Sequence, residues 1–315
     1  PGTVMYNFGA ALLRAFGDTK RPMVFLTVSG VVNACLNLFF VIVCHMSVDG
    51  VATATVISQY ISLFLVVRCL CRSEGLSHLE LKEIRLDKEE SIRMIQIGFP
   101  AGLQSMLFSI SNVLVQSSVN SFGASVVAAN TAASNIEGFI YTAMNSVFHA
   151  AITFTSQNLG AGKLSRTKRV FGSCIATSLM IGLPMCLVYF LFAPSLLSIY
   201  VSSADPSYQD VINYGLIRMR WLGCFQFLGG FMEVTCGMVR GLGKSWLPMF
   251  VTGIGACLSR IIWIYTVFQA VHTPEILYLS YPLSWILTAL MHVVCFILTY
   301  RNLAQRLANR PSAAT

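Results

Sequence analysis

The chain has 315 residues, of which 55% are hydrophobic and only 11% are charged. About a quarter of the residues in a soluble globular domain are charged, so this composition excludes an ordinary soluble protein and indicates an integral membrane protein. The formal net charge is +8, but the basic residues are scattered among apolar runs. A nucleic-acid-binding domain would gather them on one soluble face. We therefore expect the lipid bilayer, and no nucleic acid, as a partner.

Eight apolar stretches follow a shorter apolar stub at the N-terminus, and each is long enough for a helical span of ~20 residues. The strands of a membrane barrel would alternate polar and apolar residues, and these stretches do not. We therefore predict an all-α, polytopic helical membrane protein. The predicted spans are 22–44, 51–67, 95–119, 124–154, 170–201, 221–239, 248–271 and 276–300.

Lys and Arg are concentrated in every second connection between the spans, which predicts that these connections face the cytoplasm. They lie at 14–21, 68–93, 163–169, 240–244 and 301–310. The other connections carry acids such as Asp49, Asp205 and Glu275 without Lys or Arg, and are expected outside. We predict a multi-pass protein of the plasma (inner) membrane with a cytoplasmic C-terminus. Arg218 and Arg220 are exceptions. We place them near the outer interface, at the start of a long helix that runs from Ser207, where long side chains reach the headgroups.

One stretch of soluble composition, residues 72–93, divides the chain. Its mixed charges are typical of a solvated connector, and a partner-binding site is the alternative. We predict a partial N-terminal lobe at 1–72, a cytoplasmic linker at 73–92, a C-terminal six-helix lobe at 93–303 and a cytoplasmic tail at 304–315. The chain opens inside an apolar stretch and without Met, so we expect further membrane sequence before it.

The sequence predicts neither a metal site nor an enzyme. Most of the ten cysteines lie in apolar runs, and the one close pair, Cys69 and Cys71, is too tightly spaced for a CxxC motif. No arrangement of nucleophile, base and oxyanion donors is evident. A Gly-rich nucleotide-binding loop is also lacking, which disfavours transport driven by ATP. We expect no cofactor.

A ten-residue segment occurs twice. RAFGDTKRPM begins at Arg14 and RGLGKSWLPM begins at Arg240, and they share Arg, Gly, Pro and Met at the same positions. Each is predicted to be a turn with Gly ending one helix and Pro starting the next. Both turns are predicted on the same side of the membrane, which favours two parallel lobes around a central cavity, as in secondary transporters.

These turns, with the stretches ASNIEGF and SQNLGAGK, resemble the multidrug and toxic compound extrusion (MATE) family of efflux transporters. The residues in the matching turns are Arg14, Gly17, Asp18, Pro22, Gln157, Asn158, Gly160, Arg240, Gly243 and Pro248. The resemblance implies twelve helices in two six-helix lobes, with the first three absent from this chain. It also implies that a monomer exports small organic, often cationic, compounds in exchange for Na⁺ or H⁺.

Two alternatives to a drug antiporter are considered: a lipid-linked saccharide flippase of the same superfamily, and a truncated membrane remnant that does not transport. A flippase tends to need a more cationic cavity for pyrophosphate. One buried Arg260 against two buried acids, Glu137 and Glu233, argues against it.

Each of these three charges is a functional candidate, because a charge at mid-bilayer costs at least ~2.5 kcal/mol. At 1.5 Å per residue, Glu137 lies ~20 Å from the outer end of its span and Glu233 ~10 Å from the cytoplasmic end. Protons, cations and substrate can compete for such carboxylates. The resemblance implies coupling acids on helices one, seven and ten. Glu233 falls on the equivalent of helix ten, while the span at 95–119 has no acid, so Glu137 is a candidate for the second. The alternative is that one of these acids only pairs with Arg260.

Several amides inside the predicted spans are candidates to line a substrate cavity. Interhelical hydrogen bonding is the alternative role for such residues. They are Gln104, Asn112, Asn130, Asn135 and Gln226.

Overall fold

The computed structural model describes residues 1–74 and 78–309 of the chain. Every regular element in these ranges is a helix, as predicted. The chain divides into two compact units, Pro1–Lys88 and Glu89–Thr315. Residues 75–77 of the predicted linker and 310–315 of the predicted tail, including Arg310, lie outside the described residues.

The smaller unit consists of three long helices and a short turn. They are α1 (Gly2–Ala15), α2 (Lys20–Leu38, continued by a π-helical turn at Phe39–Val43), α3 (Val48–Arg72) and a 3₁₀ turn at Leu81–Glu83. Helices α1 and α3 enclose a small core that includes Tyr6, Leu13 and Val66. The Ser29 hydroxyl of α2 donates a 2.5 Å hydrogen bond to the Ser58 carbonyl of α3. Few α2 side chains are buried in the unit, so most of its apolar surface faces outward.

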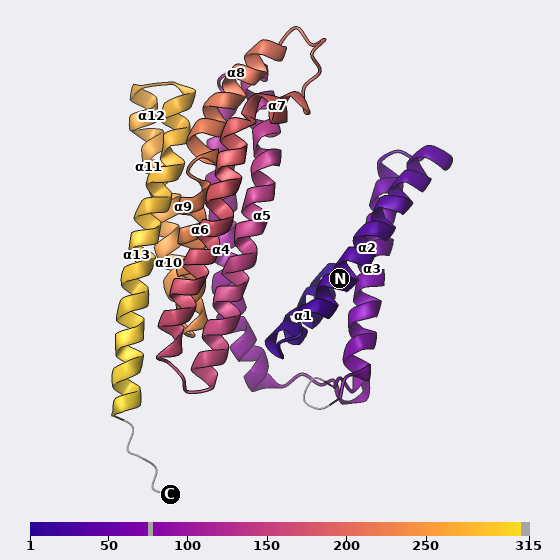
Figure 1. The fold of residues 1–315 in the computed structure, drawn as a ribbon, viewed down its shortest axis with the longest axis vertical. Helices are drawn as coiled ribbons and strands as arrows, with labels where there is room; N and C mark the ends of the chain where they lie inside the picture. The colour runs from indigo at the N-terminus through magenta and orange to yellow at the C-terminus, as the bar shows by residue number, and fades with distance from the viewer. Residues whose placement is uncertain (75–77, 310–315) are drawn as a thin grey trace, which may run out of the picture. The chain divides into compact units, whose positions relative to one another are not determined.

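The larger unit is a bundle of long helices that run side by side (Figure 1). The α-helices are α4 (Lys88–Asn120), α5 (Ala124–Gly160), α6 (Arg166–Leu191), α7 (Ala193–Ser198), α8 (Tyr208–Arg218), α9 (Gln226–Gly241), α10 (Trp246–Thr252), α11 (Ser259–Tyr265), α12 (Val267–Ala270) and α13 (Pro274–Ala308). A π-helical turn at Met219–Gly223 lies between α8 and α9, and another at Gly253–Leu258 joins α10 to α11. Residues 88–92 of the predicted linker and 304–308 of the predicted tail are thus helical.

Within the described ranges, seven helices are long and apolar enough to cross a membrane, and they correspond to seven of the eight predicted spans. The eighth prediction, 124–154, falls on α5, a helix of 37 residues whose Asn, Ser and Thr side chains dilute its apolar character. Two boundaries were wrong: the span predicted at 170–201 ends at Leu191, and the span predicted at 221–239 extends over Tyr208–Gly241. Arg218 and Arg220 lie in this helix, and its predicted start near Ser207 is confirmed.

Helix α9 packs against α5, α6 and α13 at the centre of the larger unit. Its glycines let the neighbouring helices approach closely. A Cβ atom on Gly230 would lie 1.9 Å from Met144 Cε of α5, and one on Gly241 would lie 2.7 Å from Thr155 Cβ. The centre of the bundle therefore depends on small residues along α9.

The two copies of the repeated segment form the same turn. Gly17 ends α1 with φ +89° and Gly243 ends α9 with φ +81°, a conformation that strongly favours glycine. Their backbone N–H groups donate to the carbonyls of Arg14 and Arg240, at 2.9 Å in both turns. These are Schellman ends of helices, and the predicted Gly caps are confirmed. Pro22 and Pro248 lie in the first turn of the following helices, also as predicted.

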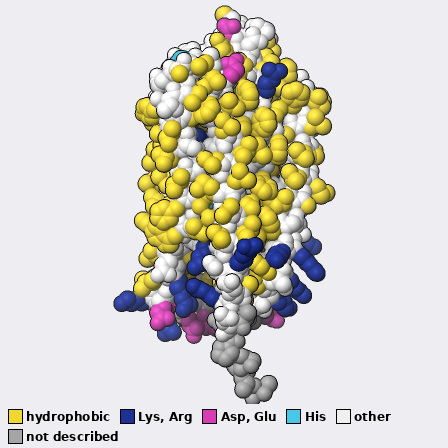
Figure 2. Space-filling view, turned by 90° about the vertical axis from the view of Figure 1, so that its left-hand side faces the viewer, with side chains coloured by type: hydrophobic (Ala, Val, Ile, Leu, Met, Phe, Trp, Pro, Cys, Tyr) yellow, Lys and Arg dark blue, Asp and Glu magenta, His cyan; other side chains and the backbone are white. Residues whose placement is uncertain are grey.

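The surface has an apolar middle and a basic end. Figure 2 shows hydrophobic side chains over the middle of the drawn face, with most of its Lys and Arg gathered at one end. The connections at this basic end of the larger unit are the α5–α6 loop, with Lys163 and followed by Arg166 at the start of α6, and the α9–α10 loop, with Lys244. An apolar band between polar ends is the surface that a multi-pass membrane protein presents to the bilayer.

Candidate functional site

Two adjoining cavities occupy the larger unit, with volumes of about 350 Å³ and 360 Å³. We call them the Glu233 cavity and the Glu137 cavity, after the acid that lines each one. Both are lined by the same five side chains: Asn112, Tyr141, Gln226, Tyr281 and Trp285. The shared walls make them two parts of one polar region inside the bundle.

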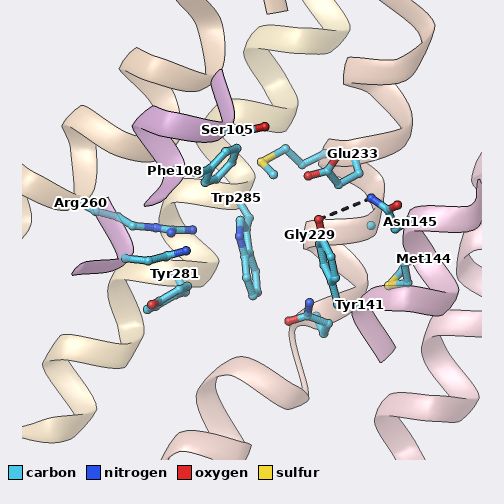
Figure 3. Close-up of a pocket in the computed structure, with 14 residues that line it drawn as sticks. Ser105, Phe108, Tyr141, Met144, Asn145, Gly229, Glu233, Arg260, Tyr281 and Trp285 are labelled. Carbon is cyan, nitrogen blue, oxygen red and sulfur yellow. Dashed lines mark hydrogen bonds between the residues drawn. The ribbon is translucent and has the colours of Figure 1, made fainter. Parts of the chain in front are cut away.

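The walls of the Glu233 cavity come from regularly spaced positions on five helices. Residues 226, 229, 230 and 233 of α9 recur at intervals that place them on one face of a helix, and so do 141, 144 and 145 of α5. Helix α4 adds Phe108, α11 adds Arg260, and α13 adds Tyr281 and Trp285. In the view of Figure 3, the Trp285 ring stands between Arg260 and Glu233.

Glu233 lines this cavity without a direct partner. Its side chain forms no hydrogen bond or ion pair with any residue of 1–74 or 78–309. Arg240, two turns along α9, acts on it only through its charge. A carboxylate in this position can accept a proton, a metal cation or a cationic ligand without first giving up a bond.

Arg260 is buried, with 2% of its surface exposed, and has no acid as a partner in the described chain. Its Nε donates a 2.8 Å hydrogen bond to Ser284 Oγ. The guanidinium carbon lies 4.1 Å from the centre of the Tyr281 ring, a cation–π contact. The interpretation that Arg260 neutralises Glu137 or Glu233 was wrong, since neither acid lies within ion-pair distance of it.

Glu137 is paired with Arg218 instead. Arg218 Nη2 donates to Glu137 Oε2 at 2.7 Å and Arg218 Nε donates to Oε1 at 3.1 Å, which is the two-bond geometry of strong guanidinium–carboxylate pairs. Both residues are buried, at 7% and 8% exposed. The prediction that the Arg218 side chain reaches the headgroups was therefore wrong, because its guanidinium is bonded inside the bundle.

Polar neighbours complete this buried pair. Asn130 Oδ1 accepts hydrogen bonds from Arg218 Nη1 at 2.5 Å and from the Tyr278 hydroxyl at 3.3 Å. The Tyr189 hydroxyl donates to Glu137 Oε1 at 3.3 Å. Four helices, α5, α6, α8 and α13, are joined through these contacts. Both oxygens of Glu137 are thus occupied, in contrast to those of Glu233.

The remaining candidate amide side chains lie in different parts of the larger unit. Asn112 and Gln226 line both cavities. Gln104 belongs to a buried chain near the basic end, where its Oε1 accepts from Arg240 Nη2 at 2.6 Å and its Nε2 donates to Thr252 Oγ1 at 3.2 Å. Asn135 is exposed and lines neither cavity. It lies about 140° around α5 from Asn130, so the two cannot face the same side.

The motif residues of the stretch SQNLGAGK end α5 and do not reach the cavities. Asn158 Nδ2 donates to the Phe154 carbonyl one turn earlier, at 2.8 Å. Gly160 is the last residue of α5, and Gly162 closes the helix with φ +69°. In the described part of the chain, no cluster of three or more His, Cys, Asp or Glu side chains is placed to hold a metal ion.

Sequence reasoning missed Arg218 and the tyrosines around it. The position of Arg218 along its helix could have indicated its pairing with Glu137. Counted from the helix start near Ser207, it lies ~16 Å along its helix, close to the ~20 Å depth of Glu137. Tyr189 and Tyr278 carry no comparable signal, because tyrosine is common in apolar spans and only the packing shows which hydroxyl meets the pair.

Comparison with known proteins finds a family model and relatives that match this chain. The MatE family model matches residues 100–266, more than half of the chain. The chain is 28% identical over 243 residues to the probable multidrug resistance protein YpnP of Bacillus subtilis, covering 76% of this chain and 52% of that protein. It is 23% identical over 258 residues to the probable multidrug resistance protein NorM of Thermotoga maritima, covering 80% and 54%.

A crystal structure of a MATE protein in complex with MaL6 has the same fold, with a TM-score of 0.84 at 20% identity. It covers 97% of this chain, which in turn covers 67% of that one. The chain spans about half the length of the curated relatives that it matches. With a matching family model over more than half of its residues, the chain belongs to the MatE family of multidrug and toxic compound extrusion transporters.

Proposed function

We propose that the protein exports small organic compounds across the membrane by alternating access, as a monomer, in exchange for Na⁺ or H⁺. The observation that carries this proposal is Glu233, a carboxylate that lines a cavity inside the bundle without a hydrogen bond or ion pair to any described residue. An unpaired acid inside a membrane protein is a site where a coupling cation and a ligand can exchange.

The rest of the cavity suits a flat organic ligand. The rings of Phe108, Tyr141 and Trp285 line it, and aromatic faces attract cations as well as apolar groups. Coupling requires that ion and substrate favour different conformations of the transporter. In this proposal Glu233 binds the ion when the substrate leaves, while the Glu137–Arg218 pair stays intact and holds its four helices together.

Dye efflux from vesicles tests the coupling. The protein is reconstituted into liposomes loaded with a fluorescent organic cation, and an inward Na⁺ gradient or an inward H⁺ gradient is imposed separately. We expect efflux to accelerate with one gradient and to return to the leak rate when an ionophore for that ion is added. Liposomes without protein are the control. An efflux rate that is the same with and without each gradient would contradict cation coupling.

We also propose that the basic end of the larger unit faces the cytoplasm, following the predicted distribution of Lys and Arg. Two exposed serines at opposite ends offer a matched test: Ser165 in the α5–α6 loop and Ser203 before α8. The Ser203 loop is ordered locally, since Ser207 donates two hydrogen bonds to the Asp205 carboxylate and thereby lowers the pKa of Asp205.

Each serine is replaced by Cys in a background without native cysteines, because Cys35 and Cys44 are exposed. Intact cells are then treated with a maleimide that does not cross membranes. We expect strong labelling of Ser203→Cys, and labelling of Ser165→Cys only after the cells are opened. The reverse pattern would invert the proposed orientation.

A further inference from the structure

Arg260 presents unused hydrogen-bond donors to the Glu233 cavity. A guanidinium carries five N–H donors in a rigid plane. Only Nε is used by the described residues, in the bond to Ser284, so the donors of Nη1 and Nη2 form none. Arg260 lines the cavity, and Figure 3 shows its guanidinium end reaching toward Trp285. Two parallel N–H groups of this kind match the two oxygens of a carboxylate or phosphate.

The charge of Arg260 is also uncompensated in the described chain. Burying a cation without a counter-charge is costly, and the one contact with its charge, the Tyr281 ring at 4.1 Å, replaces only part of its hydration. Of the two buried acids considered as its partner, Glu137 is occupied by Arg218, and Glu233 forms no ion pair with it. An anionic ligand would supply the missing charge together with acceptors for the unused donors.

Charge complementarity further defines the ligand. Once the Glu137–Arg218 pair is set aside, the Glu233 cavity holds one free acid and one free base, Glu233 and Arg260. In the view of Figure 3 they lie on either side of the Trp285 ring. A purely cationic ligand would satisfy Glu233 and be repelled by Arg260, whereas a ligand with both charges satisfies both.

We propose that Arg260 is the subsite for an oxyanion of the exported compound, so the favoured substrate is a flat aromatic molecule with a carboxylate or phosphate and a cationic nitrogen. This rests on the proposed export function, and within the expected organic, often cationic, compounds it specifies those that also carry an oxyanion. Glu233 receives the cationic end, Trp285 and Phe108 contact the ring system, and Arg260 holds the oxyanion through Nη1 and Nη2.

The test uses two dyes that differ in one group: a rhodamine with a free carboxylate and the methyl ester of the same rhodamine. Binding to the purified protein in detergent is followed by fluorescence anisotropy, which removes differences in membrane permeation. We expect the acid to bind about tenfold more tightly than the ester, the factor that a charge-assisted hydrogen bond provides. Equal binding of the two dyes by the unmodified protein would overturn the proposal.

Variants then assign the preference to a residue. Arg260→Gln should bring the two dyes to within about twofold of each other by weakening the acid alone, and Arg260→Lys, which keeps the charge without the planar fork, should fall between. Arg220→Gln makes the same change at an exposed arginine outside the cavity and should keep the full preference. A folded Arg260→Gln protein that still prefers the acid would exclude the subsite.

Two further outcomes separate this inference from the function on which it rests. If the dyes bind with the expected preference but neither is exported from liposomes, the export proposal fails and the subsite stands. If both dyes are exported but chloride abolishes the preference at millimolar concentration, the site takes a small inorganic anion and the inference about substrate fails. The comparison of dyes on the unmodified protein requires no variant, so poor folding of Arg260→Gln does not remove the test.

Discussion

Glu137→Gln is expected to destabilise the larger unit by about 3–5 kcal/mol, because it leaves the buried Arg218 guanidinium without its counter-charge. The pair is 2.7 Å long at its shorter contact and joins α5 to α8, with α6 and α13 attached through Tyr189 and Tyr278. The measurement is the thermal unfolding midpoint of the detergent-solubilised protein. Glu275→Gln, the same change at an exposed acid, is the control and should leave the midpoint unchanged.

A double variant distinguishes a structural pair from an ion-binding acid. Replacing Glu137 and Arg218 together by Met removes both charges, so no buried charge is orphaned and stability should return to within about 1 kcal/mol of the unmodified protein. Arg218→Met alone should be as damaging as Glu137→Gln. If Glu137→Gln were as stable as the unmodified protein and lost export, Glu137 would be a coupling acid and not a structural one.

The helical architecture was predictable because the bilayer constrains it so strongly. Backbone groups in lipid must be bonded within the segment, so long apolar runs become helices, and seven predicted spans coincide with such helices. The turns at Gly17 and Gly243 were predictable for a different reason, since a positive φ followed by a proline-containing first turn restricts the usable residues. Both signals are local in the sequence.

The partners of the buried charges were harder to predict from the sequence, because they depend on how each helix is rotated and how deep each residue lies. Arg218 directly precedes a π-helical turn at Met219–Gly223, which inserts an extra residue into the helical repeat and shifts which face the following positions occupy. Arg260 closely follows a second π turn, Gly253–Leu258. A regular 3.6-residue periodicity therefore assigns the wrong neighbours after each turn. The possible pairing of a buried acid with Arg260 rested on depth along the spans, and depth alone does not show which way a side chain faces.

Glu233→Gln is expected to abolish ion-driven export, lowering it at least tenfold, while the protein remains folded. The amide keeps the shape and hydrogen-bonding capacity of the carboxyl group, but it neither exchanges a proton nor balances the charge of a bound cation. Because Glu233 forms no ion pair with the described residues, neutralising it leaves no arginine without its ion-pair partner. The unfolding midpoint should therefore stay the same or rise, unlike that of Glu137→Gln.

The two acid variants form a matched pair, since the same chemical change is made in adjoining cavities. Efflux from liposomes with an imposed gradient and the unfolding midpoint are measured on both, with Glu275→Gln as the surface control. Glu233→Gln should lose efflux and keep its midpoint, and Glu137→Gln should lose stability first. A well-folded Glu233→Gln protein that exports normally would remove Glu233 from the coupling mechanism. A large fall in its midpoint would instead show that the carboxylate balances Arg240 or Arg260 through the cavity, a structural role exerted by charge at a distance.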